Sequence, residues 1–517
     1  MDKFETKGKE VDPSKPETIP KFIDELPIPR VLKPKMKAND KPHYYEIEMK
    51  EAKHQFHKLF PLTTVWGYNG TYPGPTIKVQ RNQTINVKWM NHLPEKHFLP
   101  IDRSLHGAAD SPDVRTVVHV HGANVASESD GHPEAWFTTN FSQRGSTFKQ
   151  KIYQYSNNQR AATLWYHDHA IGITRLNVYA GLAGFFLIHD PREDHLQLPK
   201  GKYDIPLMIQ DKSFQADGAL FYPENTNPPV SINPSVVPAF NGNTIVVNGK
   251  IWPYLRVEPR KYRFRLLNAS NTNAYTLRFD NDHPFYQIST DGGLLSNPVE
   301  LNSLPLEPAE RSDIIIDFTN LKGETFILRN TNDDGDLSVI MQFKVNLSLS
   351  EKDTSDIPNF LCSDHSFDIN SVQRNRLLTL SASTDHFNRP MLLLDHRMWD
   401  DPVTEKPVLN SVEIWKFINL TPFPHPIHVH LVQFKLINRI PFDIDRFNQD
   451  GFIQYTGPAR EPELYERGWK DTIKVEPGTV TSIIMRFENH IGDYVWHCHI
   501  LEHEDHDMMR PIKVIKE

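Results

Sequence analysis

Four pairs of histidines, each spaced as His-x-His, are the most unusual feature of this chain. The pairs are His119/His121, His167/His169, His428/His430 and His497/His499. Random placement of the 25 histidines among 517 residues would give about one such pair. Alternate side chains of a strand point to the same face, so each pair would present two imidazoles on one side of a strand. Together the pairs predict a cluster of nitrogen ligands for a metal.

A cysteine lies inside the last of these pairs. The segment HCHILEHEDHDMM (497–509) places Cys498 five residues before His503 and ten before Met508. A thiolate, two imidazoles and a weak axial methionine form the ligand set of blue-copper electron-transfer centres. His425, in HPIHVH, is the candidate for the second imidazole of that set. The spacing alone leaves Met509 open as an alternative to Met508.

Other metals and a purely structural cysteine are the alternatives. Imidazole also binds zinc, iron and nickel, but structural zinc sites usually contain several cysteines, and this chain has two cysteines far apart. A buried cysteine often packs as a small apolar side chain. The recurrence of His and Met at ligand spacing favours a copper ligand. On a strand, Cys498 would face one way and His497 and His499 the other, so neighbouring residues would serve two metal centres.

Short strands are expected to position these residues. TVVHVH, TLWYHDH and EIWKFINL are β-branched or aromatic runs between turn residues, which is typical of all-β sandwiches or barrels. TVVHVHGANV (116–125) resembles HPIHVHLVQF (425–434), and TLWYHDHAIG (163–172) resembles DYVWHCHILE (493–502). Between these repeats lies a third unit with a similar pattern of apolar and turn residues but without the histidines. The sequence therefore predicts three consecutive domains of one fold, the middle one without a metal site.

The expected boundaries follow from these repeats and from polar segments between them. We expect a flexible N-terminal arm at 1–25, domains at 26–191, 192–346 and 376–517, and a linker at 347–375.

Composition excludes several other classes of function. The net charge of −8 argues against nucleic-acid binding. No apolar run is long enough to span a membrane, and the charged N-terminal segment has no apolar core of a signal peptide, so we expect synthesis in the cytoplasm. Two cysteines permit at most one disulfide.

The motifs HVHG, WYHDH, HPIHVH and HCHILEHEDHDMM resemble the four copper-binding motifs of the multicopper oxidases. The resemblance extends to YNGTYPGPTI (68–77) and TRLNVYAGLAGFFLIHD (174–190), covers nearly the whole chain, and is greatest for bacterial spore-coat laccases. It implies three cupredoxin-like Greek-key domains and four copper ions. It also implies a location in the spore coat.

The family pattern implies a ligand at each matching position. The type 1 copper would take His425, Cys498, His503 and, by the family spacing, Met508 rather than Met509. The type 2 copper would take His119 and His428. The type 3 pair would take His121, His167, His169, His430, His497 and His499. All of the family's ligand positions are filled.

By the same resemblance, the protein oxidises small aromatic reductants, namely phenols and aromatic amines, with bilirubin as a further candidate. Their electrons would pass from Cys498 through His497 and His499 to the trinuclear cluster, where dioxygen is reduced to water. Glu504 and Asp130 match acidic positions that assist proton delivery in the spore-coat enzymes. The expected partners are dioxygen and these reductants, and the expected state is a monomer.

Two other functions remain open from the sequence. A metallo-oxidase would act on Cu(I) or Fe(II), but such enzymes often carry Met-rich inserts, and the 11 methionines here are scattered. A coat protein that stores copper would not need a complete thiolate centre. One departure from the spore-coat laccases concerns their disulfide: segments 240–244 and 328–335 contain no cysteine, so Cys362 is expected to be a lone structural thiol.

Overall fold

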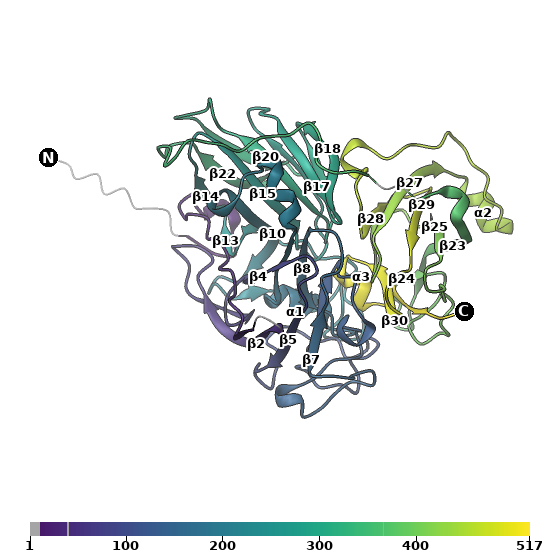
Figure 1. Cartoon of the computed structure of the whole chain (residues 1–517). Helices are drawn as coiled ribbons and strands as arrows, with labels where there is room; N and C mark the ends of the chain where they lie inside the picture. Colours follow the sequence, from purple (N-terminus) through teal and green to yellow (C-terminus); the bar gives the residue numbers. More distant parts are fainter. Residues whose placement is uncertain (1–10, 39–40, 365–366) are drawn as a thin grey trace.

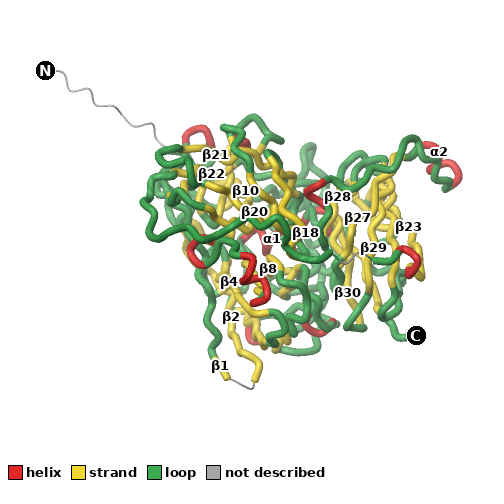
Figure 2. The backbone as a smooth tube through the Cα atoms, turned by 45° about the horizontal axis from the view of Figure 1, so that its top comes forward, coloured by secondary structure: helices red, strands yellow, loops and turns green. Residues whose placement is uncertain are grey.

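The computed structural model describes residues 11–38, 41–364 and 367–517, and strands dominate this part of the chain (Figure 2). Three β-rich domains follow one another in sequence (Figure 1). The first and middle domains lie together on the left of Figure 1, and the third, green to yellow, contacts both from the right. No described helix has the length and apolar character needed to cross a membrane.

The first domain is built from two sheets. One contains β1 (Met36–Ala38), β2 (Lys41–His54), β3 (Thr63–Tyr68), β5 (Ile85–Asn91) and β7 (Ile152–Tyr155). The other contains β4 (Gly74–Gln80), β6 (Val118–His121), β8 (Ala162–Asp168) and β9 (Ala183–His189), and helix α1 (Thr174–Ala180) follows β8. Alternate residues of β5 are buried, including Ile85, Val87 and Trp89. This alternation turns one face of the strand to the core.

The middle domain also has two sheets. The larger contains β10 (Asp204–Phe214), β11 (Leu220–Phe221), β12 (Thr244–Val247), β13 (Lys250–Ile251), β15 (Lys261–Asn268), β17 (Phe285–Thr290), β18 (Gly293–Leu301) and β20 (Arg311–Asp317). The smaller contains β14 (Tyr254–Arg256), β16 (Tyr275–Phe279), β19 (Leu304–Leu306), β21 (Thr325–Asn330) and β22 (Val339–Lys344). Phe264, Phe318 and Phe343 are buried together in its core.

The third domain repeats the two-sheet plan. One sheet contains β23 (Val372–Thr384), β24 (Pro390–Leu394), β25 (Val412–Asn419), β27 (Phe434–Pro441) and β29 (Thr479–Arg486). The other contains β26 (His425–Val429), β28 (Thr472–Val475), β30 (Gly492–Cys498) and β31 (Met509–Val514). Trp415 and Phe417 of the first sheet pack on Trp496 of the second. Helix α2 (Ile444–Asp450) lies at the outer edge, and α3 (Leu501–Asp505) follows β30 (Figure 1).

Short 3-10 helices lie in the segments outside the strands. They are η1 (Pro16–Thr18), η2 (Ser127–Ser129), η3 (Thr139–Phe141), η4 (Pro191–Leu196), η5 (Gly201–Tyr203), η6 (Asp336–Ser338), η7 (Ile369–Ser371) and η8 (Leu464–Glu466).

The all-β, three-domain architecture agrees with the prediction, and two local expectations need correction. Residues 1–10 of the expected arm lie outside the described residues. For residues 11–25 the prediction of a flexible arm is wrong, because Ile19 is buried and the backbone N–H of Phe22 donates to the carbonyl of Trp252. Strand β23 begins at Val372, inside the expected linker 347–375. The domain limits themselves stay predictions, with the strands of the three domains spanning 36–189, 204–344 and 372–514.

A buried ion pair joins the first and third domains. Asp505, at the end of α3, accepts hydrogen bonds from the backbone N–H groups of Thr174 (3.0 Å) and Arg175 (2.9 Å) at the start of α1. The guanidinium of Arg175 donates to the same carboxylate at 2.9 Å, and both side chains are buried. A carboxylate at a helix N-terminus satisfies N–H groups that have no partner within the helix. Asp505 therefore fixes α1 against α3.

We predict that Asp505→Ala lowers the apparent free energy of unfolding of the copper-free protein by about 3–5 kcal/mol, because it leaves the charge of Arg175 buried without a carboxylate, with the carbonyl of Gly172 still accepting from Nη1. Urea unfolding followed by tryptophan fluorescence measures this change. The control is Lys513→Ala, which removes the exposed pair with Asp493 (3.3 Å) and is expected to change stability by less than about 0.5 kcal/mol. Equal effects of the two variants would contradict this role of Asp505.

Candidate metal centres

Strand pairing brings the predicted ligands together. In the antiparallel pair β6–β8, His119 lies opposite His167. In the pair β26–β30, His428 lies opposite His497, and Ile427 lies opposite Cys498. Consequently all four His-x-His pairs meet between the first and third domains, and all eight side chains are buried.

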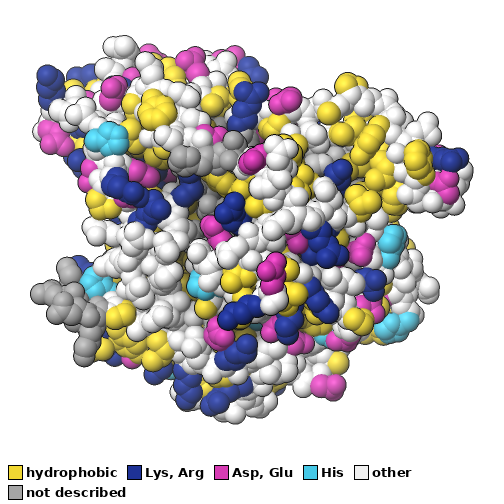
Figure 3. Space-filling view, turned by 45° about the vertical axis from the view of Figure 1, so that its right-hand side comes forward, with side chains coloured by type: hydrophobic (Ala, Val, Ile, Leu, Met, Phe, Trp, Pro, Cys, Tyr) yellow, Lys and Arg dark blue, Asp and Glu magenta, His cyan; other side chains and the backbone are white. Residues whose placement is uncertain are grey.

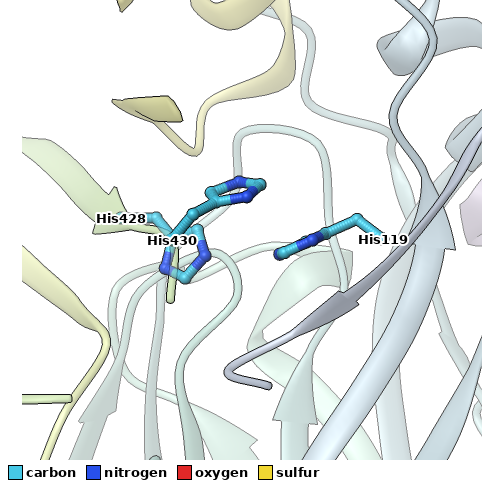
Figure 4. A group of neighbouring side chains, drawn as sticks. All are labelled: His119, His428 and His430. Atoms are coloured by element: carbon cyan, nitrogen blue, oxygen red, sulfur yellow. The ribbon is translucent and has the colours of Figure 1, made fainter. Parts of the chain in front are cut away.

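The eight histidines form three groups of three, and His430 belongs to two of them. In each group, one nitrogen of every ring lies within 4.8 Å of the others. One group contains His121, His167 and His499; a second contains His169, His430 and His497; the third contains His119, His428 and His430. Figure 4 shows the third group, in which His119 comes from β6 and His428 and His430 come from the opposite side, from β26 and the residue after it. Each group is a set of imidazoles around a common point.

The hydrogen bonds of the outer ring nitrogens determine which nitrogens face that point. His430 Nδ1 lies 2.7 Å from Asp130 Oδ2, and His497 Nδ1 lies 3.0 Å from the carbonyl oxygen of Cys498. Because a carbonyl oxygen only accepts, Nδ1 of His497 carries the proton and Nε2 of that ring carries a lone pair. His430 Nε2 lies 3.2 Å from His169 Nε2 and 3.3 Å from His497 Nε2. Lone pairs converging in this way are suited to a cation between them.

Other ring nitrogens of the cluster have no hydrogen-bond partner among the described residues. They include His119 Nε2, His121 Nδ1, His167 Nε2, His428 Nε2, and both nitrogens of His499. Buried polar atoms in proteins nearly always have a partner, so this many orphans in one place need an explanation. Bound metal ions supply it, and an all-imidazole donor set suits copper.

Burial also keeps these imidazoles in the form that binds metals. Desolvation lowers the pKa of His119, His121 and His428 well below its usual value, and neighbouring histidines lower it further. The rings are therefore neutral at physiological pH, as metal ligation requires.

A second site lies around Cys498 in the core of the third domain. Its Sγ lies 3.6 Å from His425 Nδ1 and 3.6 Å from His503 Nδ1. Thr421 Oγ1 lies 2.7 Å from His425 Nε2, which leaves Nδ1 of that ring facing the sulfur. Burial raises the pKa of the Cys498 thiol, so the thiolate would need a cation beside it. A soft metal such as copper fits this sulfur and two imidazoles.

The structure distinguishes the two candidate methionines. The carbonyl of Met508 accepts a hydrogen bond from the backbone N–H of Cys498 at 3.0 Å, and the Met508 side chain is buried in the same core cluster as Cys498. Met509 instead packs in a cluster with Ile171, Trp399 and Val495. Met508 is thus the methionine that shares the core cluster of Cys498.

Two predicted carboxylates contact the histidine cluster. Glu504 Oε1 lies 3.1 Å from His169 Nδ1, and its Oε2 lies 3.0 Å from His497 Nδ1. Burial would raise the pKa of Glu504, but His497 and His169 hold it well below its usual range. Asp130 contacts His430, and burial raises the pKa of its carboxyl well above its usual value. Both acids lie within hydrogen-bond distance of ring nitrogens of the cluster.

Sequence reasoning missed Asp471, Thr472 and Thr421. Asp471 Oδ1 and Thr472 Oγ1 each lie 3.0 Å from His121 Nε2, and the carbonyl of Asp471 accepts from His428 Nδ1 at 2.7 Å. Asp471 and Thr472 reach the cluster because β28, which begins at Thr472, pairs with β26. An isolated Asp-Thr at the start of a strand carries no spacing signal, so the sequence alone could not have identified them.

Comparison with known proteins agrees with this geometry. Family models described as multicopper oxidase match residues 51–114 and 108–193, 222–345 and 370–517. A laccase of Bacillus subtilis is 53% identical over 510 residues, covering 96% of this chain and 99% of the relative. A laccase of Bacillus stratosphericus is 52% identical, covering 96% of this chain and 100% of the relative.

A solved structure shows the same architecture. The crystal structure of a laccase from Pediococcus acidilactici superposes with a TM-score of 0.77 at 28% identity, covering 96% of this chain and 95% of that one. The family's cofactors are four copper ions, one of type 1, one of type 2 and two of type 3, and the histidine and cysteine groups fit them. By family models over most of its length and by relatives of more than half identity, the chain belongs to the multicopper oxidase family.

Proposed function

We propose that this laccase-type multicopper oxidase takes electrons from its reductant at Cys498 and delivers them to dioxygen in the eight-histidine cavity. The observation that carries the proposal is the covalent adjacency of the two sites. Cys498 faces His425 and His503, whereas its bonded neighbours His497 and His499 belong to two different groups of the cavity. The backbone between them is a short bonded path from the thiol to both groups.

The ligand assignment follows the groups found in the cavity. We assign His425, Cys498, His503 and Met508 to type 1 copper, His119 and His428 to type 2, and the triads His121/His167/His499 and His169/His430/His497 to the type 3 pair. When bound, copper supplies the one-electron redox chemistry and the reduction of dioxygen to water. The chain itself buries every histidine of the cavity, and this burial lowers the pKa of His119, His121 and His428.

Glu504 and Asp130 are proposed to deliver the protons that this reduction consumes. Glu504 lies between His169 and His497, which belong to one triad, and Asp130 contacts His430 of the same triad. Carboxylates are effective proton donors when they lie within hydrogen-bond reach of the reacting groups.

Small aromatic reductants are the proposed substrates. His503 keeps 9% of its surface exposed whereas His425 is fully buried, so an electron donor would approach from the side of His503. Phe423, two residues before His425, is 58% exposed and offers an aromatic face near this side of the domain. Phenols and aromatic amines suit such a surface, and bilirubin is a further candidate from the family resemblance.

The oligomeric state and the cellular location of the protein are also proposals. We propose a monomer, and we also propose that it has no nucleic-acid partner. The support for the second point is the net charge of −8 and the mixture of acidic and basic side chains on the face shown in Figure 3. A place in the spore coat, after synthesis in the cytoplasm, rests on the resemblance to spore-coat laccases. Gel filtration and fractionation of spores test these points.

The first prediction from this function concerns the thiol. After reconstitution with copper, we expect a strong blue absorption and oxygen uptake with a phenol, and Cys498→Ser is expected to lose the colour and to reduce uptake to background, because no thiolate remains. Cys362→Ser is the matched control, since this second cysteine lies outside both sites and is expected to keep the colour and the activity. Uptake with Fe(II) but not with a phenol would favour a metallo-oxidase, and bound copper without uptake would favour storage.

The second prediction separates proton delivery from electron entry. Glu504→Gln is expected to lower steady-state oxygen uptake about 10²–10⁴-fold, while the rate at which a phenol bleaches the blue colour without oxygen stays unchanged. Stopped-flow absorbance and an oxygen electrode measure the two rates. Glu405→Gln, another buried glutamate, is the control and should leave both unchanged. Equal losses in bleaching and uptake would contradict a proton role for Glu504.

A further inference from the structure

An arginine of the middle domain reaches the histidine cavity. Arg311, the first residue of β20, is fully buried, and its guanidinium donates two hydrogen bonds to the Asp471 carboxylate of the third domain, one of them 2.7 Å long from Nη1 to Oδ1. Its Nε donates to the carbonyl of Thr163 at 2.9 Å. Thr163 lies on β8, the strand that carries His167. One guanidinium therefore connects all three domains beside the cavity.

Asp471 in turn contacts histidines from two domains. Its Oδ1 lies 3.0 Å from Nε2 of His121 in the first domain, and its carbonyl accepts from Nδ1 of His428 in the third. The two imidazoles are stacked, with ring centroids 3.6 Å apart and planes 18° apart. Asp471 thus contacts both rings, and Thr472 Oγ1 adds a second contact of 3.0 Å to the same Nε2 of His121.

This contact decides which nitrogen His121 offers to the cavity. Because Asp471 is an acceptor, Nε2 of His121 carries the proton, and Nδ1 is the nitrogen left without a partner. His119, His167 and His428 do the opposite: their Nδ1 atoms face carbonyl oxygens, and Nε2 is left free. His121 therefore presents Nδ1 rather than Nε2 to the cavity, and its contact with Asp471 Oδ1 holds the ring in this orientation.

Asp471 acts through the histidines rather than as a ligand. It lies within ligand distance of His121 and His428, but both of its carboxylate oxygens accept from Arg311. A carboxylate held by a guanidinium fork is fixed in orientation and has less electron density to offer a metal. The pair is itself anchored, because Asp291 accepts from the backbone N–H of Arg311 and lies 3.0 Å from the ammonium of Lys470.

Gly122, the residue after His121, packs directly against this ion pair. Gly122 has φ of +88°, and a Cβ at this position would lie 2.5 Å from Asp471 Oδ2 and 2.8 Å from Arg311 Nη2. Only glycine has the conformational freedom and the lack of a side chain that this close approach requires. The HVHG motif and the Arg311–Asp471 pair are therefore packed directly against each other.

We propose that Asp471, held by Arg311, is a positioning residue of the trinuclear site, and that the middle domain in this way sets the geometry of a copper centre to which it gives no ligand. The inference rests on the proposed function, in which His121 and His428 are copper ligands. The pair fixes the nitrogen that His121 presents and locks His121 and His428 together across the boundary between the first and third domains.

The test compares Asp471→Asn and Arg311→Lys with Arg376→Lys after copper reconstitution. Arg376 forms a matched buried fork with Glu413 at 2.6 and 3.0 Å, and neither residue contacts a histidine of the cavity. Lysine keeps the charge at position 311 but cannot make the paired hydrogen bonds. The readouts are copper per chain, the blue thiolate absorption, the electron paramagnetic resonance signal of type 2 copper, and oxygen uptake.

We expect Asp471→Asn and Arg311→Lys to keep the blue absorption but to alter or lose the type 2 signal and to lower oxygen uptake about 10–100-fold. Arg376→Lys is expected to match the wild type in all four readouts. Arg311→Lys keeps the test decisive if Asp471→Asn does not fold.

Three results would count against the inference. A wild-type type 2 signal and undiminished uptake in both variants would overturn it. So would loss of the blue absorption together with the type 2 signal, because the pair would then only support the fold. A wild-type protein without blue absorption or oxygen uptake would contradict the proposed function itself, and the inference would fail with it.

Discussion

The structure depends on a buried cavity in which imidazoles from two domains point ring nitrogens at one another. His430 Nε2 lies 3.2 Å from His169 Nε2 and 3.3 Å from His497 Nε2, and buried imidazole nitrogens this close together are suited to a copper ion between them. Most of the rings are held from outside by an acceptor, such as a backbone carbonyl or the Glu504 carboxylate, whereas both nitrogens of His499 have no partner among the described residues. These acceptors fix the tautomers, and the two domains supply rings from opposite sides.

Helix α3 connects the two metal sites to the rest of the molecule. Glu502 accepts hydrogen bonds from Tyr222 and Thr272 of the middle domain, at 2.7 Å each. The next residue, His503, faces Cys498; Glu504 contacts the cavity; and Asp505 holds α1 of the first domain. The four consecutive residues 502–505 of the third domain thus contact the first and middle domains and both metal sites. A shift of this one turn would change the thiol site and the cavity together.

Much of this could be predicted from the sequence because the information is local. The His-x-His spacing and the alternation of strand faces predict the clustering of imidazoles, and the position of Cys498 predicts that two centres are adjacent. Contacts between residues distant in sequence left no such pattern. Arg311 and Asp471 are 160 residues apart, and nothing in their neighbours indicates that they meet beside His121. Residues 11–25 look polar and mobile in sequence, yet Ile19 is buried.

The most direct test of the account is anomalous diffraction at the copper edge from crystals of the reconstituted protein. The account predicts four copper positions, one beside the sulfur of Cys498 and three inside the cavity bounded by the eight histidines. It also predicts that Nδ1 of His121 faces the metal while Nε2 stays on Asp471. An empty site at Cys498, or a single metal ion in the cavity, would contradict the account of two coupled centres.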